Sequence, residues 1–243
     1  MMASTSPRPP PKEGFNFTFD PKLHSLFNRS MRAFLSNIPV YRLIAIGALV
    51  FIRTPLTVHP EQEDRILLIQ RASHDIFPLL WEIPGGGCDH SDETILHGLA
   101  RELWEESGLR MKSVVREVGQ GDSFYGKDDY LIVKFSFEVE VFHDDPQHMF
   151  PQVTLDPNEH VRFLWATEEE CRRGKVVVVH GCGDRDGEVV DIPFTVQQQK
   201  EDILRGFEQR REARMGEDAN SRNGHKIITK YRDGDRRKRA ESF

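Results

Sequence analysis

Three glutamates in this chain have the type and spacing that a metal site needs. Glu102, Glu105 and Glu106 stand at positions i, i+3 and i+4, so on a helix their side chains would project from one face. Like charges at these spacings destabilise a bare helix by roughly 0.2–0.5 kcal/mol per pair. A hard divalent cation would turn this repulsion into binding, because Mg²⁺ prefers carboxylate and water oxygens as ligands. The pattern therefore predicts a metal site with positions left for water and for phosphate oxygens of a substrate.

The alternative interpretation of this acidic run is a solvated helix face, which is what most charge runs form. Two features of the sequence argue against it. Leu103 and Trp104 lie between the glutamates, so the acidic face borders an apolar one. Upstream lie Gly85, Gly86 and Gly87, and a glycine backbone lets amide groups come close to an anion. The glycine loop and the acidic helix together favour a site that handles phosphate groups.

A helix over residues Glu93–Ser107 is expected to carry the glutamates. Gly108 stands where a left-handed cap would end this helix, and Asp92 or Ser91 is the expected N-cap. The apolar residues that recur at helical spacing and predict its buried face are Ile95, Leu96, Leu99, Ala100, Leu103 and Trp104.

The rest of the chain alternates between predicted strands and helices. Apolar, β-branched-rich runs predict strands over Val40–Ile52, Arg65–Arg71, Leu79–Ile83, Tyr130–Val141 and Val161–Ala166. Thr167 and Glu170 fit a capping box that opens a short helix, and the last helix is expected over Phe194–Met215. This order predicts one mixed α/β (α+β) domain over residues 21–215.

The segment before the first strand is basic and contains apolar residues near helical spacing. Residues 1–20 begin Pro-rich and are expected to form a disordered tail. From Pro21 to Pro60 there is no acidic residue, which a mitochondrial targeting segment would also show. Glu13 and Asp20 argue against targeting, so we expect a short amphipathic helix packed on the domain edge. Its apolar residues are Leu23, Phe27, Met31, Phe34 and Leu35.

Residues 216–243 are expected to form a second disordered tail. Its Arg222–Arg239 stretch contains basic residues and ends in the cluster Arg236–Arg239. A solubilising end, nuclear targeting through that cluster and phosphate contacts to RNA are the three interpretations. Acidic residues dilute the tail and motifs that contact bases are missing, so a nucleic-acid partner is possible but not favoured.

Composition excludes several classes of protein. The chain has 243 residues and a formal net charge of −6. Its longest apolar run, Leu43–Ile52, has 10 residues, whereas a membrane-spanning helix needs about 20. Three cysteines are too few for a disulfide framework or a cysteine-based zinc site. The first residues lack the apolar stretch of a secretory signal, so a cytoplasmic protein without a membrane partner is expected.

The stretch from Gly87 to Leu109 resembles the signature of a known family. Gly87, five residues, Glu93, seven residues and then the run from Arg101 to Leu109 are similar to a complete Nudix box. The resemblance implies a mixed β-sheet sandwiched between helices, with the box as loop–helix–loop. It also implies Mg²⁺- or Mn²⁺-dependent hydrolysis of a nucleoside diphosphate linked to another moiety, with a nucleotide-type small molecule as the partner.

The resemblance assigns roles to individual residues. Glu102 and Glu106 are implied as primary metal ligands, and Glu105 as a further ligand or as the group that activates water. Arg101 is implied to orient the box glutamates through charge-assisted hydrogen bonds, with Glu93 as its expected partner. Gly85, Gly86 and Gly87 would shape the loop on the phosphate side. Family members differ in their general base, and Glu159 is the candidate outside the box, with an ordinary loop glutamate as the alternative.

The aromatic residues near the box allow two interpretations. Trp81, Phe124, Tyr125 and Tyr130 could pack in the core or at its edge, as aromatic residues most often do. They could also form a wall on which a nucleobase stacks. For substrate contact we single out Trp81 and Tyr125, the latter near the position of a tyrosine linked with dinucleoside polyphosphate enzymes of the family.

Two functions compete with an active diphosphate hydrolase on a small nucleotide. The first is a Nudix-like module that binds a nucleotide without cleaving it. Such a module should lose box carboxylates, and here all three are present. The second is a hydrolase that acts on RNA 5′ ends, with the basic tail holding the polymer.

Overall fold

The computed structural model describes residues 8–54, 62–126, 129–143, 148, 150–178 and 187–216. By its internal contacts the chain divides into a first unit, residues 1–205, and a second unit, residues 206–243. In the second unit, residues 206–216 are helical. The predicted basic stretch Arg222–Arg239 lies outside the described residues.

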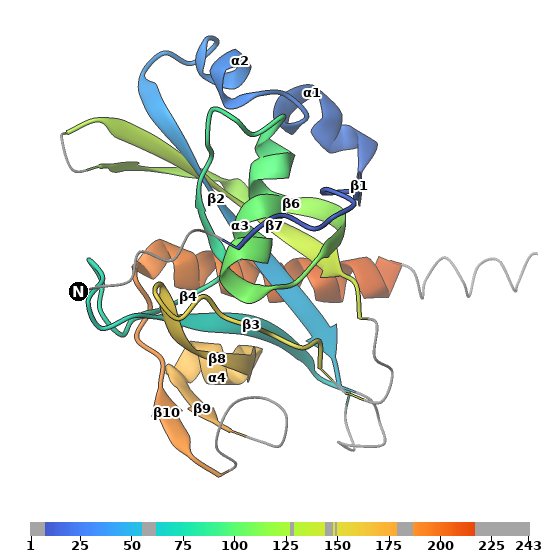
Figure 1. Cartoon of the computed structure of the whole chain (residues 1–243). Coiled ribbons are helices and arrows are strands. Elements are labelled where there is room, and N and C mark those ends of the chain that lie inside the picture. Colours follow the sequence, from blue (N-terminus) through green and yellow to red (C-terminus); the bar gives the residue numbers. More distant parts are fainter. Residues whose placement is uncertain are drawn as a thin grey trace, which may run out of the picture. The chain divides into compact units, whose positions relative to one another are not determined.

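The first unit is built on a mixed β-sheet (Figure 1). Its strands are β1 (Thr18–Phe19), β2 (Tyr41–Arg53), β3 (Asp64–Arg71), β4 (Trp81–Glu82), β5 (Gly85–Gly87), β6 (Met111–Tyr125), β7 (Leu131–Val141) and β8 (His160–Thr167). The main path runs β1–β6–β7–β2–β3–β4, while β5 pairs with β2 and β8 pairs with β3. β2 runs parallel to β7 and antiparallel to β3 and β5. The expected mixed α+β fold is therefore confirmed.

Helices and a small hairpin complete the first unit. They are the 3-10 helix η1 (Pro21–Leu23), α1 (His24–Phe27), α2 (Met31–Leu35), α3 (Ile95–Ser107), α4 (Glu168–Arg173), and the hairpin of β9 (Lys175–Val177) with β10 (Val189–Asp191). Residues 197–205 are helical as well. The capping box of α4 is formed as predicted by Thr167 and Glu170. Among the described residues, no helix is both long and apolar enough to cross a membrane.

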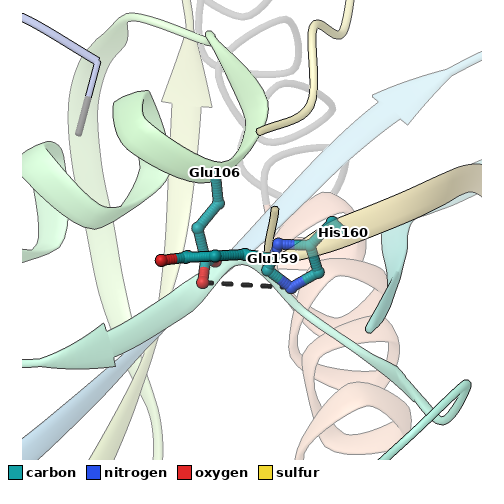
Figure 2. Close-up of side chains that lie close together, drawn as sticks. All are labelled: Glu106, Glu159 and His160. Carbon is teal, nitrogen blue, oxygen red and sulfur yellow. Dashed lines mark ion pairs between the residues drawn. The ribbon is translucent and has the colours of Figure 1, made fainter. Parts of the chain in front are cut away.

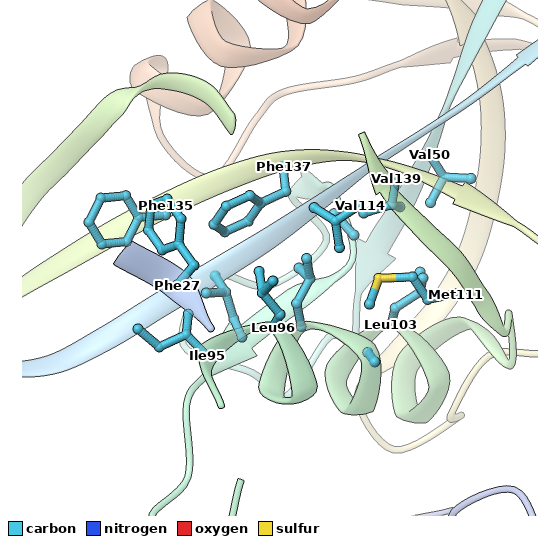
Figure 3. Close-up of a cluster of buried hydrophobic side chains, with 14 of the residues drawn as sticks. Phe27, Val50, Ile95, Leu96, Leu103, Met111, Val114, Phe135, Phe137 and Val139 are labelled. Carbon is cyan, nitrogen blue, oxygen red and sulfur yellow. The ribbon is translucent and has the colours of Figure 1, made fainter. Parts of the chain in front are cut away.

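The main core lies between one face of the sheet and α1, α2 and α3 (Figure 3). Alternate residues of β7, including Phe135 and Phe137, point into this core. Phe27 of α1 packs edge-on against both, with ring centroids 5.0 and 4.9 Å apart. Among the apolar residues predicted to form the buried face of α3, only Trp104 is partly buried. The others are buried: Ile95, Leu96, Leu99, Ala100 and Leu103. Each large apolar side chain buried here contributes about 2 kcal/mol, and together they fix α3 on the sheet.

The N-terminal segment differs from its predicted form. Instead of one helix, α1 ends at Phe27 and α2 starts anew after Ser30, whose hydroxyl accepts a hydrogen bond from the Ala33 amide at 3.3 Å. Residues 8–20, expected to be disordered, also have defined contacts. The Arg8 guanidinium donates to the Trp104 carbonyl at 3.0 Å, and β1 pairs with β6. Phe27 of α1 and Met31 and Phe34 of α2 are nevertheless buried, as packing on the domain edge requires, while Leu26 is exposed.

The longest strand, β6, is absent from the predictions. Gly119 and Gly121 adopt positive φ angles of 87° and 80° within it, and its pairing with β7 shifts register between Val118 and Asp122. Such bulges interrupt the alternation of apolar and polar residues by which a strand is detected. For this reason the alternation of apolar and polar residues does not predict β6.

Candidate functional site

The box helix α3 begins later than expected and ends where expected. Its N-cap is Thr94, whose hydroxyl accepts a hydrogen bond from the His97 amide at 3.2 Å. The expected cap at Asp92 is wrong, because both of its carboxylate oxygens bind the Arg101 guanidinium at 2.9 Å. Gly108 caps the C-terminus in the left-handed conformation with a φ of 69°. Helix α3 is therefore connected to the preceding loop by the Arg101 side chain as well as by its Thr94 cap.

Arg101 connects the loop and two of the predicted metal ligands. Beyond Asp92, one guanidinium nitrogen donates to Glu102 at 2.9 Å and to Glu105 at 3.0 Å. Another donates to the Gly87 carbonyl at 3.0 Å. These charge-assisted bonds connect Arg101 with both carboxylates, and the orienting role implied by the resemblance stays a prediction.

The partner predicted for Arg101 is not the one observed. The side chain of Glu93 is 80% exposed and pairs with His97 at 3.6 Å instead. Asp92, one residue earlier, takes its place beside Arg101. Helix α3 starts only at Ile95, so Glu93 lies before the helix and does not project from the face that carries Arg101.

The glycine loop lies directly on the carboxylates. The Gly85 amide donates to one Glu106 oxygen at 2.6 Å, and a Cβ built on Gly86 would lie 2.7 Å from the carboxylate carbon of Glu102. Gly85 has a φ of 154°, and a Cβ there would lie 2.1 Å from the Ile46 carbonyl oxygen of the neighbouring strand. In this structure the loop thus approaches protein carboxylates; its predicted contact with substrate phosphate remains a prediction.

Glu106 meets Glu159 and His160 at the start of β8 (Figure 2). One potential ligand atom from each residue lies within 4.8 Å of the other two. Glu106 is 5% exposed and His160 is 2% exposed, and the Glu106 oxygen lies 3.9 Å from His160 Nε2. The structure thus brings Glu159, predicted as the carboxylate outside the box, beside a predicted metal ligand, although 53 positions separate them.

The sequence did not predict His160 or the ion-pair network of Glu82, Arg71 and Asp75 that it contacts. His160 Nε2 lies 3.2 Å from Glu82, and Glu82 accepts a hydrogen bond from Arg71 at 2.5 Å. Arg71 also donates to Asp75 at 2.5 Å. The only available signal was the position of His160 next to Glu159, because Glu82 lies 78 residues away in the sequence. This network fixes the back of the site.

Three carboxyl groups of the site have raised pKa values. Burial raises the pKa of Glu106 well above its usual range, and the charges of Glu82 and Glu102 raise it further. Burial raises the pKa of Glu102 to about 7, despite the opposing charge of Arg101. Glu159 is exposed by its surface area, and partial burial of its carboxyl raises its pKa. Carboxylates that repel one another are stabilised by a bound divalent cation, and this oxygen-rich set fits Mg²⁺ or Mn²⁺.

The raised pKa of Glu102 predicts a pH-dependent stability of the metal-free protein. Its carboxyl has an ordinary value of 4.5 and a folded value of about 7, so between these values the folded state binds more protons than the unfolded state. The free energy of unfolding should therefore fall as pH rises through this window, by up to about 3 kcal/mol from this group. Urea unfolding in chelator at about pH 5 and about pH 7.5 measures it. In Glu102→Gln the fall should be smaller, and an equal fall in both proteins would contradict the assignment.

The two aromatic residues singled out for substrate contact lie in different surroundings. Trp81 is fully buried, and its amide donates to the Pro193 carbonyl at 2.8 Å. The prediction that Trp81 offers a stacking face is therefore wrong for this structure, because packing covers the ring. Tyr125 ends β6 and is 73% exposed. Its contact with a nucleobase stays a prediction.

The chain is similar to known proteins in sequence. A family model described as NUDIX domain matches residues 53–181, a range that includes α3, the glycine loop and Glu159. A MutT-like protein of Streptomyces ambofaciens is 43% identical over 51 residues, which are 21% of this chain and 30% of that protein. The m7GpppN-mRNA hydrolase NUDT17 of Homo sapiens is 26% identical over 144 residues, which are 55% of this chain and 41% of that protein.

The similar solved structures include the MutT protein from Methanosarcina mazei Go1. It is 21% identical with a TM-score of 0.44, and the match covers 70% of this chain and 94% of that one. The chain spans less than half the length of the two curated relatives described above.

Proposed function

Because the chain belongs to the NUDIX domain family, we propose that it is a divalent-cation-dependent pyrophosphohydrolase. The bond cleaved is the diphosphate bond of a nucleoside diphosphate linked to another moiety. The observation that carries the proposal is the meeting of Glu106, Glu159 and His160 beside the two glutamates held by Arg101. These side chains come from α3 and β8 and from the loop before β8, and they form a carboxylate-rich site that no single element could form.

The residues of this site divide the work. Glu102 and Glu106, with Glu105 as a further ligand, would hold Mg²⁺ or Mn²⁺. When bound, such a cation neutralises charge on phosphate oxygens and lowers the pKa of an attached water. Arg101 keeps Glu102 and Glu105 in place through its bonds at 2.9 and 3.0 Å. The Gly85 amide and the surrounding burial fix the direction of the Glu106 carboxylate.

Glu159 is the better of the two candidate general bases. The Arg101 guanidinium donates to one Glu105 oxygen at 3.0 Å, so this oxygen is already engaged by the protein. No described residue donates a hydrogen bond to the Glu159 carboxylate, and burial raises its pKa. A carboxylate with these properties can accept the proton of an attacking water. We therefore assign proton removal to Glu159 and orientation to the pair of Arg101 and Glu105.

Capped RNA is the second candidate substrate. Two of the similar curated proteins, from Homo sapiens and Bos taurus, are named m7GpppN-mRNA hydrolase NUDT17. A cap of this kind joins two nucleosides through phosphoanhydride bonds, so it falls within the proposed bond class. The same catalytic residues would serve either substrate, and the difference would lie in the groups that hold the moieties on each side of the bond.

The test of the proposed function is a hydrolysis assay of the full chain on a substrate panel. The panel contains ADP-ribose, dinucleoside polyphosphates, nucleotide sugars, oxidised nucleoside triphosphates and capped RNA. Each substrate is incubated with Mg²⁺, with Mn²⁺ and with excess chelator, and the products are identified by mass spectrometry. We expect cation-dependent cleavage between two phosphorus atoms of at least one substrate. Nucleotide binding without any cleavage would contradict the proposal and favour a binding module.

A further inference from the structure

We propose that Lys134 is a binding residue that holds a phosphate group of the substrate beside the Glu106 carboxylate. The inference rests on the function proposed above, and it assigns the place of the substrate's negative charge within that site. It depends on the position of Lys134 in the sheet, on the direction of its side chain, and on its lack of an ion-pair partner.

Lys134 lies on the face of β7 that is turned away from the main core. Its neighbours Val133 and Phe135 belong to the buried core cluster with α3, and side chains alternate between the two faces of a strand. Ser136, two residues on, shares the face of Lys134, and its hydroxyl donates to Asp202 at 2.7 Å. This second face therefore carries polar side chains in a largely buried position, where each needs a partner.

The end of the Lys134 side chain reaches toward the loop that holds Glu106. A Cβ built on Gly47 of β2 would lie 3.6 Å from Lys134 Cε. Gly47 pairs directly with Gly85 across β2 and β5, and the Gly85 amide donates to Glu106 at 2.6 Å. The same Cβ would lie 2.7 Å from Ile83 Cδ1, so the Ile83 side chain and the end of Lys134 share the space beside Gly47. Strand β2 lies between β7, which carries Lys134, and β5, whose Gly85 amide binds the proposed metal ligand Glu106.

Lys134 differs from the other cations of the site in its pairing. Arg101 and Arg71 each bind carboxylates at 3.0 Å or less. Within the part of the chain that the structure describes, no carboxylate oxygen lies within the 4.0 Å ion-pair distance of Lys134 Nζ. Burial lowers its pKa, and the more distant charges of Glu82, Asp202 and Glu106 oppose that shift. By surface area Lys134 is partly buried. An ammonium group that is partly withdrawn from water and has no direct ionic partner favours an anion beside it, and a phosphate oxygen is a partner that lysine commonly binds.

The alternative role for Lys134 is that of a structural counter-charge for the surrounding carboxylates. The two roles predict different behaviour of Lys134→Met, which removes the charge and keeps most of the side-chain volume. A structural counter-charge would lower the stability of the metal-free variant. If Lys134 instead binds the ligand and has no protein partner, stability should stay unchanged or rise, because the substitution removes an unpaired charge from a partly buried position.

The experiment is calorimetric titration of the full chain with methylenediphosphonate in the presence of Mg²⁺. This probe is a diphosphate analogue that cannot be hydrolysed and carries no nucleoside. We expect Lys134→Met to bind it about tenfold more weakly than wild type or worse, with a thermal midpoint no lower than that of wild type. The matched control is Lys112→Met, whose lysine is exposed on β6 and pairs with Glu140 at 3.4 Å, and this variant should bind like wild type.

Four results would overturn the inference. They are equal binding by wild type and Lys134→Met, no binding by wild type, weaker binding accompanied by an equal loss in Lys112→Met, and a thermal midpoint of Lys134→Met below that of wild type. If Lys134→Met fails to fold, Lys134→Gln carries the same expectation with a polar side chain. Failure of the proposed function can be told apart from failure of this inference. In that case the probe would still bind in a Lys134-dependent way, but no substrate of the panel would be cleaved.

Discussion

Replacing Glu106 with glutamine is expected to lower turnover about a thousandfold, the loss typical of removing one group that stabilises charge in a transition state. Glutamine keeps the size of the side chain and can still accept the hydrogen bond that the Gly85 amide donates at 2.6 Å. It lacks the negative charge that a divalent cation requires. Initial rates on the best substrate of the panel, at saturating Mg²⁺ and Mn²⁺, measure the effect.

The matched control for this variant is Glu93→Gln. Glu93 is also a box glutamate, but its side chain is 80% exposed and its nearest ionic partner is His97 at 3.6 Å. We expect its turnover to stay within about twofold of wild type, since exposed ion pairs contribute little. Equal losses in both variants would show that turnover depends on the total negative charge of the box. The assignment of Glu106 as a metal ligand would then be wrong.

Alanine at Gly85 is expected to destabilise the protein by about 3 kcal/mol or more. A Cβ at this position would lie 2.1 Å from the Ile46 carbonyl oxygen and 2.7 Å from the Gly47 Cα, which are backbone atoms of β2. The strand cannot move aside without breaking its pairing with β7. In addition, a φ of 154° is unfavourable for alanine. Urea unfolding of the metal-free proteins measures the difference in the free energy of unfolding.

The two following glycines provide graded comparisons for this prediction. At Gly86 a Cβ would meet only the carboxylate of Glu102, at 2.7 Å, and that carboxylate is the end of a flexible side chain. Gly86→Ala should therefore keep its stability within about 1 kcal/mol of wild type, while the displaced Glu102 lowers turnover. At Gly87 a Cβ would meet nothing within 4 Å, so Gly87→Ala should change stability by less than about 0.5 kcal/mol. Equal destabilisation by all three would contradict the close-approach explanation.

The end of the box helix could be predicted from sequence, whereas its beginning could not. Gly108 ends α3 because few other residues adopt the left-handed conformation there at no cost. At the beginning, Ser91, Asp92 and Thr94 are all residue types that cap helices. A tertiary contact decided among them, since the Arg101 guanidinium binds both oxygens of Asp92 and leaves Thr94 to cap the helix.

The back of the site depends on strand pairing that no local spacing reveals. Glu82 in β4 lies opposite Ile69 of β3, and His160 in β8 lies opposite Arg71 of the same strand. β3 therefore lies between two segments that are 78 residues apart and brings their side chains together. Sequence analysis could name Glu159 from its place before a strand, but it had no means to find Glu82.

Burial decided the role of the aromatic residues. Trp81 and Tyr125 are both large aromatic residues near strands that flank the site, and their sequence surroundings do not distinguish them. In the structure Trp81 is completely buried, and its backbone forms a parallel β-bridge with Phe194. Tyr125, at the end of β6, is exposed. The segment after β10 pairs with β4 through this bridge and lies more than 100 residues downstream, so the sequence around Trp81 does not reveal it.

The most direct test of the proposed site is Mn²⁺ binding followed by electron paramagnetic resonance. Free Mn²⁺ is titrated with the wild-type full chain and with Glu106→Gln in the absence of substrate. We expect that wild type removes the signal of free Mn²⁺ at one equivalent and that Glu106→Gln binds at least about tenfold more weakly. Equal binding by both proteins would place the cation away from Glu106, Glu159 and His160 and would contradict the central claim.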